Sequence, residues 1–314
     1  MSTLKSASWK FLVVPLVLGL FSCASPRVAQ DAPAPVTPGV PVPEGTPVPP
    51  TSPPRSITLV VGGTGVASYA TVGLLKKLHE EGVEIELIIA TGWPAVFALA
   101  NGFLRSIHDL EWFATRLDRK DFERIGSVDF RRDLDPREAL KGIILDSFPQ
   151  MLISESRTPV VISATNTDLG ELDVYGSGEW KEPLLKTASV PGVFRPFLSE
   201  RGSDWMAGIT GLDVREALRR GATHVVAMGA YNDFLSWIVQ KEEGNDAVSR
   251  RQYASQLRKS NQEAMKQAAY SIDMDLRRAP LDFGAKRAAI LAGYREGAKL
   301  IRKLREPASS TTAN

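Results

Sequence analysis

The sequence predicts an α/β fold with a mostly parallel central sheet flanked by helices in three layers. One reason is that short runs of β-branched and apolar residues alternate with longer stretches of helical character. A second is that several of these runs are apolar throughout, as is typical of parallel strands that helices bury on both faces. A third is length, because residues 55–305 suffice for one sizeable domain of this class.

The elements of the first half follow in order. "SITLVV" at 56–61 is expected to form a buried strand that ends at glycines, and residues 67–81 a helix. "IELIIAT" at 85–91 is expected to be the second strand. The stretch "PAVFALANGFLRSI" is the predicted helix after it, with Pro94 in the first turn, where proline is tolerated.

The second half continues the alternation. Residues 106–148 are charged and predicted to be helical. The later predicted strands are "TPVVISATNTD", its edge neighbour "ELDVYGSG", "SDWMAG" and "THVVAMGA". Short helices are expected at "EPLLKTASV" and "DVREALRRGA", the second ending at Gly221. From Asp233 onward the chain is predicted to be mainly helical, and the tail at 307–314 is predicted to be disordered.

The amino-terminal residues are predicted to be a targeting segment. A basic start precedes an apolar run at 11–22, which suits a signal-peptide core and is short for a membrane span. The run ends in "LFSC", which resembles a bacterial lipobox and implies cleavage before Cys23 and acylation of that residue. The alternative is a generic signal peptide or anchor with an incidental cysteine. Because Cys23 is the only cysteine, no intramolecular disulfide can form.

A proline-rich stretch follows. We therefore expect a lipoprotein signal peptide at 1–22, the acylated Cys23 with an extended proline-rich linker at 23–54, and the α/β domain at 55–306. This organisation predicts a protein of the bacterial cell envelope. Ala24 stands where an aspartate is associated with inner-membrane retention in some bacteria, which favours the outer membrane.

Composition gives few further indications. A net charge of +2 does not favour a nucleic-acid partner. The three histidines are scattered without metal-ligand spacing, and no metal or cofactor is expected.

Three segments together resemble the bacterial patatin-like phospholipase family. They are "VVGGTGVASYATVGLLKKLHEEGVEIELIIATGWPA", "VVISATNTDLGELDVYGSG" and "ASVPGVFRPFLSERGSDWMAGI". Their order and spacing extend the resemblance over residues 57–304, and it implies a patatin-like three-layer sandwich. A dinucleotide-binding fold competes, but its G-x-G-x-x-G pattern fits Gly63, Gly65 and Ser68 poorly.

The resemblance also implies where the family's chemistry should lie. The family uses a serine in G-x-S-x-G, an aspartate in Asp-Gly-Gly, and glycine-loop amides that stabilise the oxyanion. In this chain Gly92 takes the nucleophile position, Ala207 the aspartate position, and Ala67 that of the loop arginine. What persists is an elbow of Thr91, Trp93 and Pro94 and an oxyanion-loop remnant of Gly62, Gly63, Thr64 and Gly65. Trp93 is expected either to pack in the core or to fill the vacated cleft.

The sequence therefore favours a pseudoenzyme that acts by binding a phospholipid, a fatty-acyl ligand or a protein partner, held at the membrane through acylated Cys23. The alternative is a lipid acyl hydrolase with a relocated nucleophile. Its hydroxyl candidates are Ser68, Thr64 and Thr91, beside Asp204 or Asp213, although Asp213 also suits a helix cap. A third hypothesis is a plain structural component of the envelope.

Overall fold

A computed structural model of the chain describes residues 56–116, 136–148, 150–191, 194, 196–198, 204–206, 211–240 and 247–306. The predicted signal peptide, the linker with Cys23, the tail at 307–314 and Ala207 lie outside the described residues.

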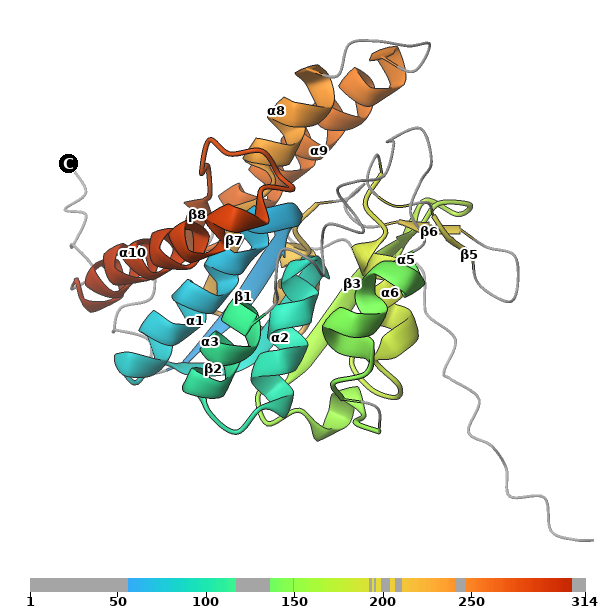
Figure 1. The fold of residues 1–314 in the computed structure, drawn as a ribbon. Coiled ribbons are helices and arrows are strands. Elements are labelled where there is room, and N and C mark those ends of the chain that lie inside the picture. The colour runs from blue at the N-terminus through green and yellow to red at the C-terminus, as the bar shows by residue number, and fades with distance from the viewer. Residues whose placement is uncertain are drawn as a thin grey trace, which may run out of the picture. The chain divides into compact units, whose positions relative to one another are not determined.

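The described strands form one eight-stranded sheet in the order β5-β6-β3-β2-β1-β7-β8, with β4 paired to β3 (Figure 1). The strands are β1 Ser56–Gly63, β2 Glu84–Gly92, β3 Val160–Asn166, β4 Glu171–Tyr175, β5 Phe197–Leu198, β6 Asp204–Met206, β7 Val225–Ala230 and β8 Tyr270–Asp273. The ladders among β3, β2, β1, β7 and β8 are parallel, and those of β4, β5 and β6 are antiparallel. The predicted α/β class with a mostly parallel sheet is thus confirmed.

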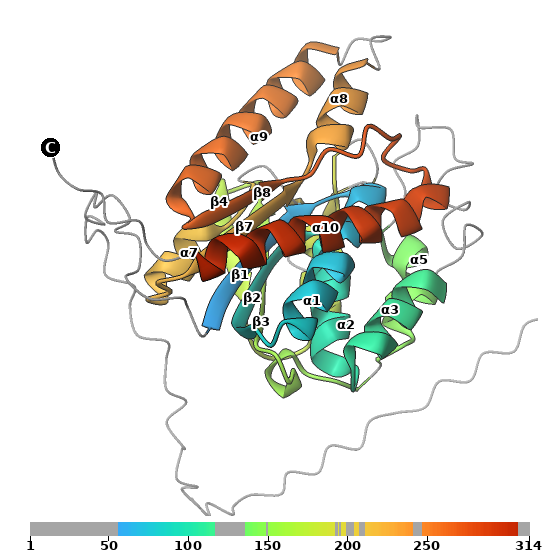
Figure 2. The ribbon, with the colours of Figure 1, turned by 90° about the vertical axis from the view of Figure 1, so that its left-hand side faces the viewer.

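Helices cover both faces of this sheet. The α-helices are α1 Ala70–Glu80, α2 Pro94–Phe103, α3 Ile107–Arg116, α5 Pro136–Leu140, α6 Lys181–Ala188, α7 Val214–Arg219, α8 Asn232–Gln240, α9 Ala247–Gln267 and α10 Lys286–Arg305. Single 3-10 or π turns are η1 Gly65–Tyr69, η2 Lys141–Leu145, η3 Ile153–Glu155 and η4 Phe283–Ala285. Figure 2 shows α1, α2, α3 and α10 on one side of the sheet and α7 and α9 on the other.

The central strands are apolar because both of their faces are covered. Strands β3 and β7 are buried along their whole length, and β1 is buried from its second residue onward. The edge strand β4 has no fully buried residue. The sequence pattern that predicted parallel strands therefore reflects this double burial.

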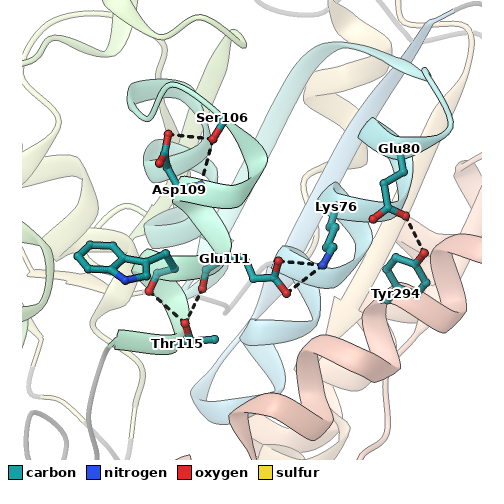
Figure 3. A network of polar contacts seen from close by, with 8 residues as sticks. Lys76, Glu80, Ser106, Asp109, Glu111, Thr115 and Tyr294 are labelled. Atoms are coloured by element: carbon teal, nitrogen blue, oxygen red, sulfur yellow. Dashed lines mark hydrogen bonds and ion pairs between the residues drawn. The ribbon is translucent and has the colours of Figure 1, made fainter.

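Helices α1 and α10 cross in close contact. A Cβ placed on Gly73 would lie 1.8 Å from the Ile290 carbonyl oxygen, and one on Gly293 would lie 1.9 Å from that of Ala70. On the outer side of this layer, side chains of neighbouring helices form hydrogen bonds and an ion pair (Figure 3). Lys76 donates to both carboxylate oxygens of Glu111 on α3 at 3.0 and 2.8 Å. The two glycines thus let α10 lie directly on α1.

Three details differ from the sequence prediction. The helix expected from residue 67 begins as a 3-10 turn at Gly65 and becomes α-helical at Ala70. The helix expected after β2 is two helices, separated where Leu104 adopts an extended conformation at ψ 155°. The carboxy-terminal part is mainly helical, as predicted, but it also contains the unpredicted strand β8, which pairs in parallel with β7. Only Ile272 of β8 is buried, so this strand has little apolar signal.

Candidate functional site

The predicted elbow lies where β1 and β2 end together. Gly63 and Gly92 are the last paired residues of their ladder, and α2 begins with Pro94 in its first turn. Gly92 has a φ of +75°, a left-handed conformation that L-residues with a side chain rarely adopt. A Cβ at this position would lie 2.3 Å from the Gly63 carbonyl oxygen. A side chain at residue 92 therefore cannot be accommodated unless the backbone moves.

The amides of this elbow are bonded within the protein. The Gly92 N–H donates to Thr187 Oγ1 at 2.8 Å, and the Trp93 N–H donates to the Gly63 carbonyl at 3.1 Å. In nucleophile-elbow hydrolases, the N–H of the residue after the nucleophile is one of the two oxyanion donors. Trp93 follows the predicted nucleophile position, and its N–H already has an acceptor.

The glycine-rich loop is closed in the same way. The Thr64 N–H donates to the Ala230 carbonyl at 3.3 Å, and the Val66 N–H donates to the buried Pro280 carbonyl at 2.7 Å. Gly65 has a φ of +64°, and a Cβ there would lie 2.2 Å from the same carbonyl oxygen. The Val66 amide of this loop is therefore already bonded to Pro280 within the protein.

Pro280 belongs to a segment that we call the strap, residues 274–285, which connects β8 to α10. The buried Asp233 carboxylate fixes the strap by accepting from the Leu276 N–H at 3.1 Å and the Arg278 N–H at 2.9 Å. Asn232 also donates to the Met274 carbonyl at 3.2 Å. Residues at the start of α8 therefore fix the position of the strap, whose Pro280 carbonyl accepts from the glycine-rich loop.

Aromatic side chains fill the volume beside the elbow. Trp93 is 4% exposed and is stacked between Phe194 and Phe283, with ring centroids 5.7 Å from each. Phe283 comes from the strap, and it also contacts Tyr69 edge-on. Trp93 therefore packs in the core beside the elbow, and its role of filling a vacated cleft stays a prediction.

The three hydroxyl groups considered as relocated nucleophiles are buried. Exposure is 2% for Thr64, 0% for Ser68 and 1% for Thr91. Within the described residues, the hydroxyls of Ser68 and Thr91 have no hydrogen-bond partner. None of the three bonds to a carboxylate in that part of the chain, so none has the adjacent base that a hydroxyl nucleophile needs.

A different hydroxyl and carboxylate do meet. Ser163 of β3 donates to Asp213 Oδ2 at 2.7 Å, and both residues are buried. Asp213 Oδ1 accepts from the Glu216 N–H at 3.2 Å, which makes it the N-cap of α7. Burial raises the pKa of Asp213 above its ordinary value, against the opposing effect of the Ser163 hydroxyl bond.

Thr187 connects this pair to the elbow. Its hydroxyl accepts from the Gly92 N–H and donates to the Ser163 carbonyl at 2.6 Å. One chain of bonds therefore runs from β2 through α6 and β3 to the start of α7. Sequence reasoning missed Ser163 and Thr187, since their roles depend on the pairing of Ser163 with Thr91 across two strands.

The predicted acid position comes directly after β6. This strand pairs with Thr165 and Asn166 of β3, beyond the last residue that β3 pairs with β2. It lies on the β2 edge of β3, because β4 occupies the other edge at the same two residues. Asp204 begins β6 and Met206 ends it. Ala207 follows and is outside the described residues.

The described residues contain neither a metal cluster nor a membrane-spanning helix. No group of three or more His, Cys, Asp or Glu side chains among them is arranged to hold a metal ion. In the same part of the chain, no helix combines the length and apolar character needed to cross a bilayer. A hollow of about 210 Å³ is lined by Gln150, Met151, Leu152, Glu179, Trp180 and Lys181 and is separate from the elbow residues.

Comparison with solved structures gives a structural likeness but no family match. A scan against models of protein families finds no match to the chain. Among solved structures, the chain is similar to VipD from Legionella pneumophila, with a TM-score of 0.44 and 11% sequence identity. The similarity covers 80% of this chain and 67% of VipD. Fold and site together define an α/β protein whose elbow and glycine-rich loop donate their hydrogen bonds inward.

Proposed function

We propose that the chain is a patatin-like pseudoenzyme that lacks acyl-hydrolase activity and acts by binding. The observation that carries this is the bonding of the Gly92, Trp93, Thr64 and Val66 amides to acceptors within the protein. An oxyanion hole needs such donors aimed at the developing negative charge, and losing one costs about a hundred- to thousandfold in rate. Loss of the nucleophile costs about a millionfold in a serine hydrolase.

The proposal extends to where the protein acts. The lipobox-like "LFSC" supports acylation of Cys23 and anchoring in the bacterial envelope, with the outer membrane favoured by Ala24. Several acyl chains, each methylene contributing about 0.8 kcal/mol, give stable anchoring. The proline-rich linker, at about 3.1 Å per residue, allows the domain to reach several tens of ångströms from the membrane.

The packing of the elbow bears on what is bound. Trp93, Phe194 and Phe283 occupy the volume beside Gly92, where the family resemblance would place an acyl ester. A lipid or protein bound at another surface requires no rearrangement of these rings. We therefore favour binding away from the elbow over an acyl ligand held in it.

One experiment separates binding from hydrolysis. The purified protein is incubated with a fluorophosphonate probe and with acyl esters, and intact mass and released fatty acid are measured. We expect no adduct and no turnover above a protein-free blank. Ligand-observed binding with phospholipids and fatty acids then tests the lipid arm, and a pull-down from envelope extract tests the protein arm. Saturable labelling of one hydroxyl would contradict the proposal.

A hydrolase with a relocated nucleophile is the second candidate, favoured by the Ser163–Asp213 pair. The pair has the composition of a Ser-Asp dyad, and a raised pKa of Asp213 would make its carboxylate a better base. Against it, the Ser163 side chain is 0% exposed and Asp213 is engaged as a helix cap. Turnover that Ser163→Ala abolishes, while circular dichroism shows that the variant is still folded, would establish this candidate.

A further inference from the structure

Basic residues are concentrated on two helices. Helices α9 and α10 together carry twelve Lys or Arg residues and two Glu, although the whole chain has a net charge of only +2. The rest of the chain is therefore acidic on balance. Such separation of charge directs one part of a molecule toward anionic partners.

The cations of α10 lie on its outer side. The buried residues of α10 fall on one stripe that faces α1: Ala289, Ile290, Gly293, Gly297, Leu300, Ile301 and Leu304. The opposite stripe is exposed and consists of Arg287, Leu291, Arg295, Lys299, Arg302 and Lys303. We call this exposed stripe the α10 face. At about 1.5 Å per residue, it runs along most of a helix about 30 Å long.

Most of these cations are not neutralised. Lys299 pairs with Glu296 at 2.6 Å, and Arg305 beside the stripe pairs with Glu81. For Arg287, Arg295, Arg302 and Lys303, no ion pair is present within the described part of the chain. Leu291 is 48% exposed in the midst of these charges. The α10 face thus combines free positive charge with one accessible apolar side chain, and clustered Lys and Arg residues are attracted to anionic lipid surfaces.

The position of α10 relative to the proposed anchor supports the same reading. The linker joins the domain at Ser56, which pairs with Glu84 at the start of β2. Glu81, just before β2, pairs with Arg305 at the end of α10 at 2.7 Å. The basic last turn of α10 therefore lies near the point at which a membrane tether would enter the domain.

We propose that the α10 face binds the surface of an anionic phospholipid membrane. The contact is peripheral, with Arg and Lys side chains against lipid phosphates and Leu291 entering the headgroup region. It rests on the proposed function only for the tether, because the charge argument stands without acylation. Tethering through Cys23 would raise the effective concentration of this face at the bilayer.

Helix α9 supplies a matched comparison. It also exposes cations, but Ser255, Gln256, Gln262 and Glu263 are interleaved with them on its outer side. It covers the other face of the sheet, on β7 and β8 (Figure 2). If total charge alone caused binding, removing three cations from either helix would weaken binding equally.

The test measures cosedimentation of the chain from Ala24 to Asn314, which lacks the acylated cysteine and keeps the compact unit Thr46–Asn314 whole. The vesicles contain phosphatidylcholine alone or mixed with phosphatidylglycerol. One triple variant carries Arg295→Gln, Arg302→Gln and Lys303→Gln on α10. Its control carries Arg258→Gln, Lys259→Gln and Lys266→Gln on α9, with the same change of charge and similar helix propensity.

We expect binding to the phosphatidylglycerol vesicles that falls as salt is raised, and little binding to phosphatidylcholine alone. Each Lys or Arg near an anionic surface strengthens binding about fivefold, so the α10 triple variant should bind about a hundredfold more weakly. The α9 variant should lose less than about threefold by the same scale. Unfolding midpoints of both variants are measured to show that each remains folded.

Three results would overturn the inference. One is equal loss of binding in the two triple variants, and another is equal binding to the two kinds of vesicle. The third is α10-dependent binding to double-stranded DNA, used as an anionic polymer, without binding to vesicles. Fluorophosphonate labelling of the protein would overturn the proposed function and would leave this inference intact.

Discussion

Polar groups at the carboxyl end of the sheet are hydrogen-bonded within the protein, whereas those on the α10 face are exposed to solvent. At the sheet end, the Gly92, Trp93 and Val66 amides all donate to acceptors inside the protein. On α10, Arg295 and Arg302 extend into solvent without an ion pair in the described residues. A ligand at the sheet end must first displace a bond, whereas a ligand on α10 displaces only water.

Under the proposed function, this difference shows how a scaffold would keep its shape without catalytic chemistry. An enzyme leaves donors unsatisfied in its resting state so that the transition state can use them. Here those donors stabilise the fold, as buried polar groups ordinarily do. The inner bonds thus contribute to stability, and the proposed function assigns binding to the surface.

The largest effect on stability is expected at Trp93, beside the elbow. Replacing it with alanine removes a ring stacked between Phe194 and Phe283, and large aromatic truncations in cores cost about 3–5 kcal/mol. The control is Trp112→Ala on α3, because Trp112 is 62% exposed and touches only Arg116 among described ring contacts. It should cost less than about 1 kcal/mol. Urea unfolding measures both, and similar costs would mean that Trp93 does not fill the elbow.

Placing a serine at residue 92, the predicted nucleophile position, tests whether the elbow has room for a side chain. Gly92→Ser should destabilise the fold by about 2–5 kcal/mol, from left-handed strain and from the approach to the Gly63 carbonyl. The control is Gly178→Ser, since Gly178 has a φ of +77° and a Cβ added there would meet nothing within 4 Å. Left-handed strain alone costs about 1–2 kcal/mol, which is the loss expected of the control. Equal losses in urea unfolding would show that residue 92 is not sterically closed.

The same Gly92→Ser variant should show no fluorophosphonate adduct, because the Trp93 amide remains bonded to Gly63. Intact mass spectrometry provides this readout. A stable, readily labelled variant would show that the site is open and that only the nucleophile was missing.

Thr187 tests the bond chain that joins the elbow to β3. Thr187→Val removes the acceptor of the Gly92 N–H and the donor to the Ser163 carbonyl, and a buried group left unsatisfied costs about 1–3 kcal/mol. Thr71→Val is the matched control, because the Thr71 hydroxyl is equally buried and has no partner in the described residues. It should be neutral or slightly stabilising in thermal unfolding. Equal changes in the unfolding temperature of the two variants would show that the Thr187 hydrogen bonds do not stabilise the fold.

The smallest expected effect is the pH dependence that arises from Asp213. Its folded pKa is raised by burial, so the native state holds this proton more tightly than the unfolded state does. Stability should therefore fall as pH rises from the ordinary aspartate pKa through the raised value. In Asp213→Asn this contribution disappears. Unfolding free energies of both proteins across that range give the difference, and a constant difference would contradict the assigned shift.

Much of the fold could be predicted because burial on both faces leaves a clear sequence signal. The runs "SITLVV" and "VVISATN" are β1 and β3, and both are almost wholly buried. Strand β8 gave no such signal, since it has four residues and buries only Ile272. Its pairing with β7 depends on neighbours that are remote in sequence.

The sequence predicted only those features of the site that depend on the local backbone conformation. A glycine before Trp93-Pro94 indicates a sharp turn, and Gly92 indeed has a positive φ. The closure of the site was not predictable, because Thr187 and Pro280 reach the elbow and the loop from elements far along the chain. The Ser163–Asp213 bond likewise depends on strand register.

Amide hydrogen exchange tests the closed sheet end most directly. We predict that the Gly92, Trp93 and Val66 amides exchange as slowly as the Ile88 amide, a buried strand position bonded to the Pro159 carbonyl. Two-dimensional NMR of the native protein in deuterated water resolves these sites individually. Exchange of Trp93 and Val66 within the dead time, with Ile88 still protected, would show donors open to solvent and would contradict the account.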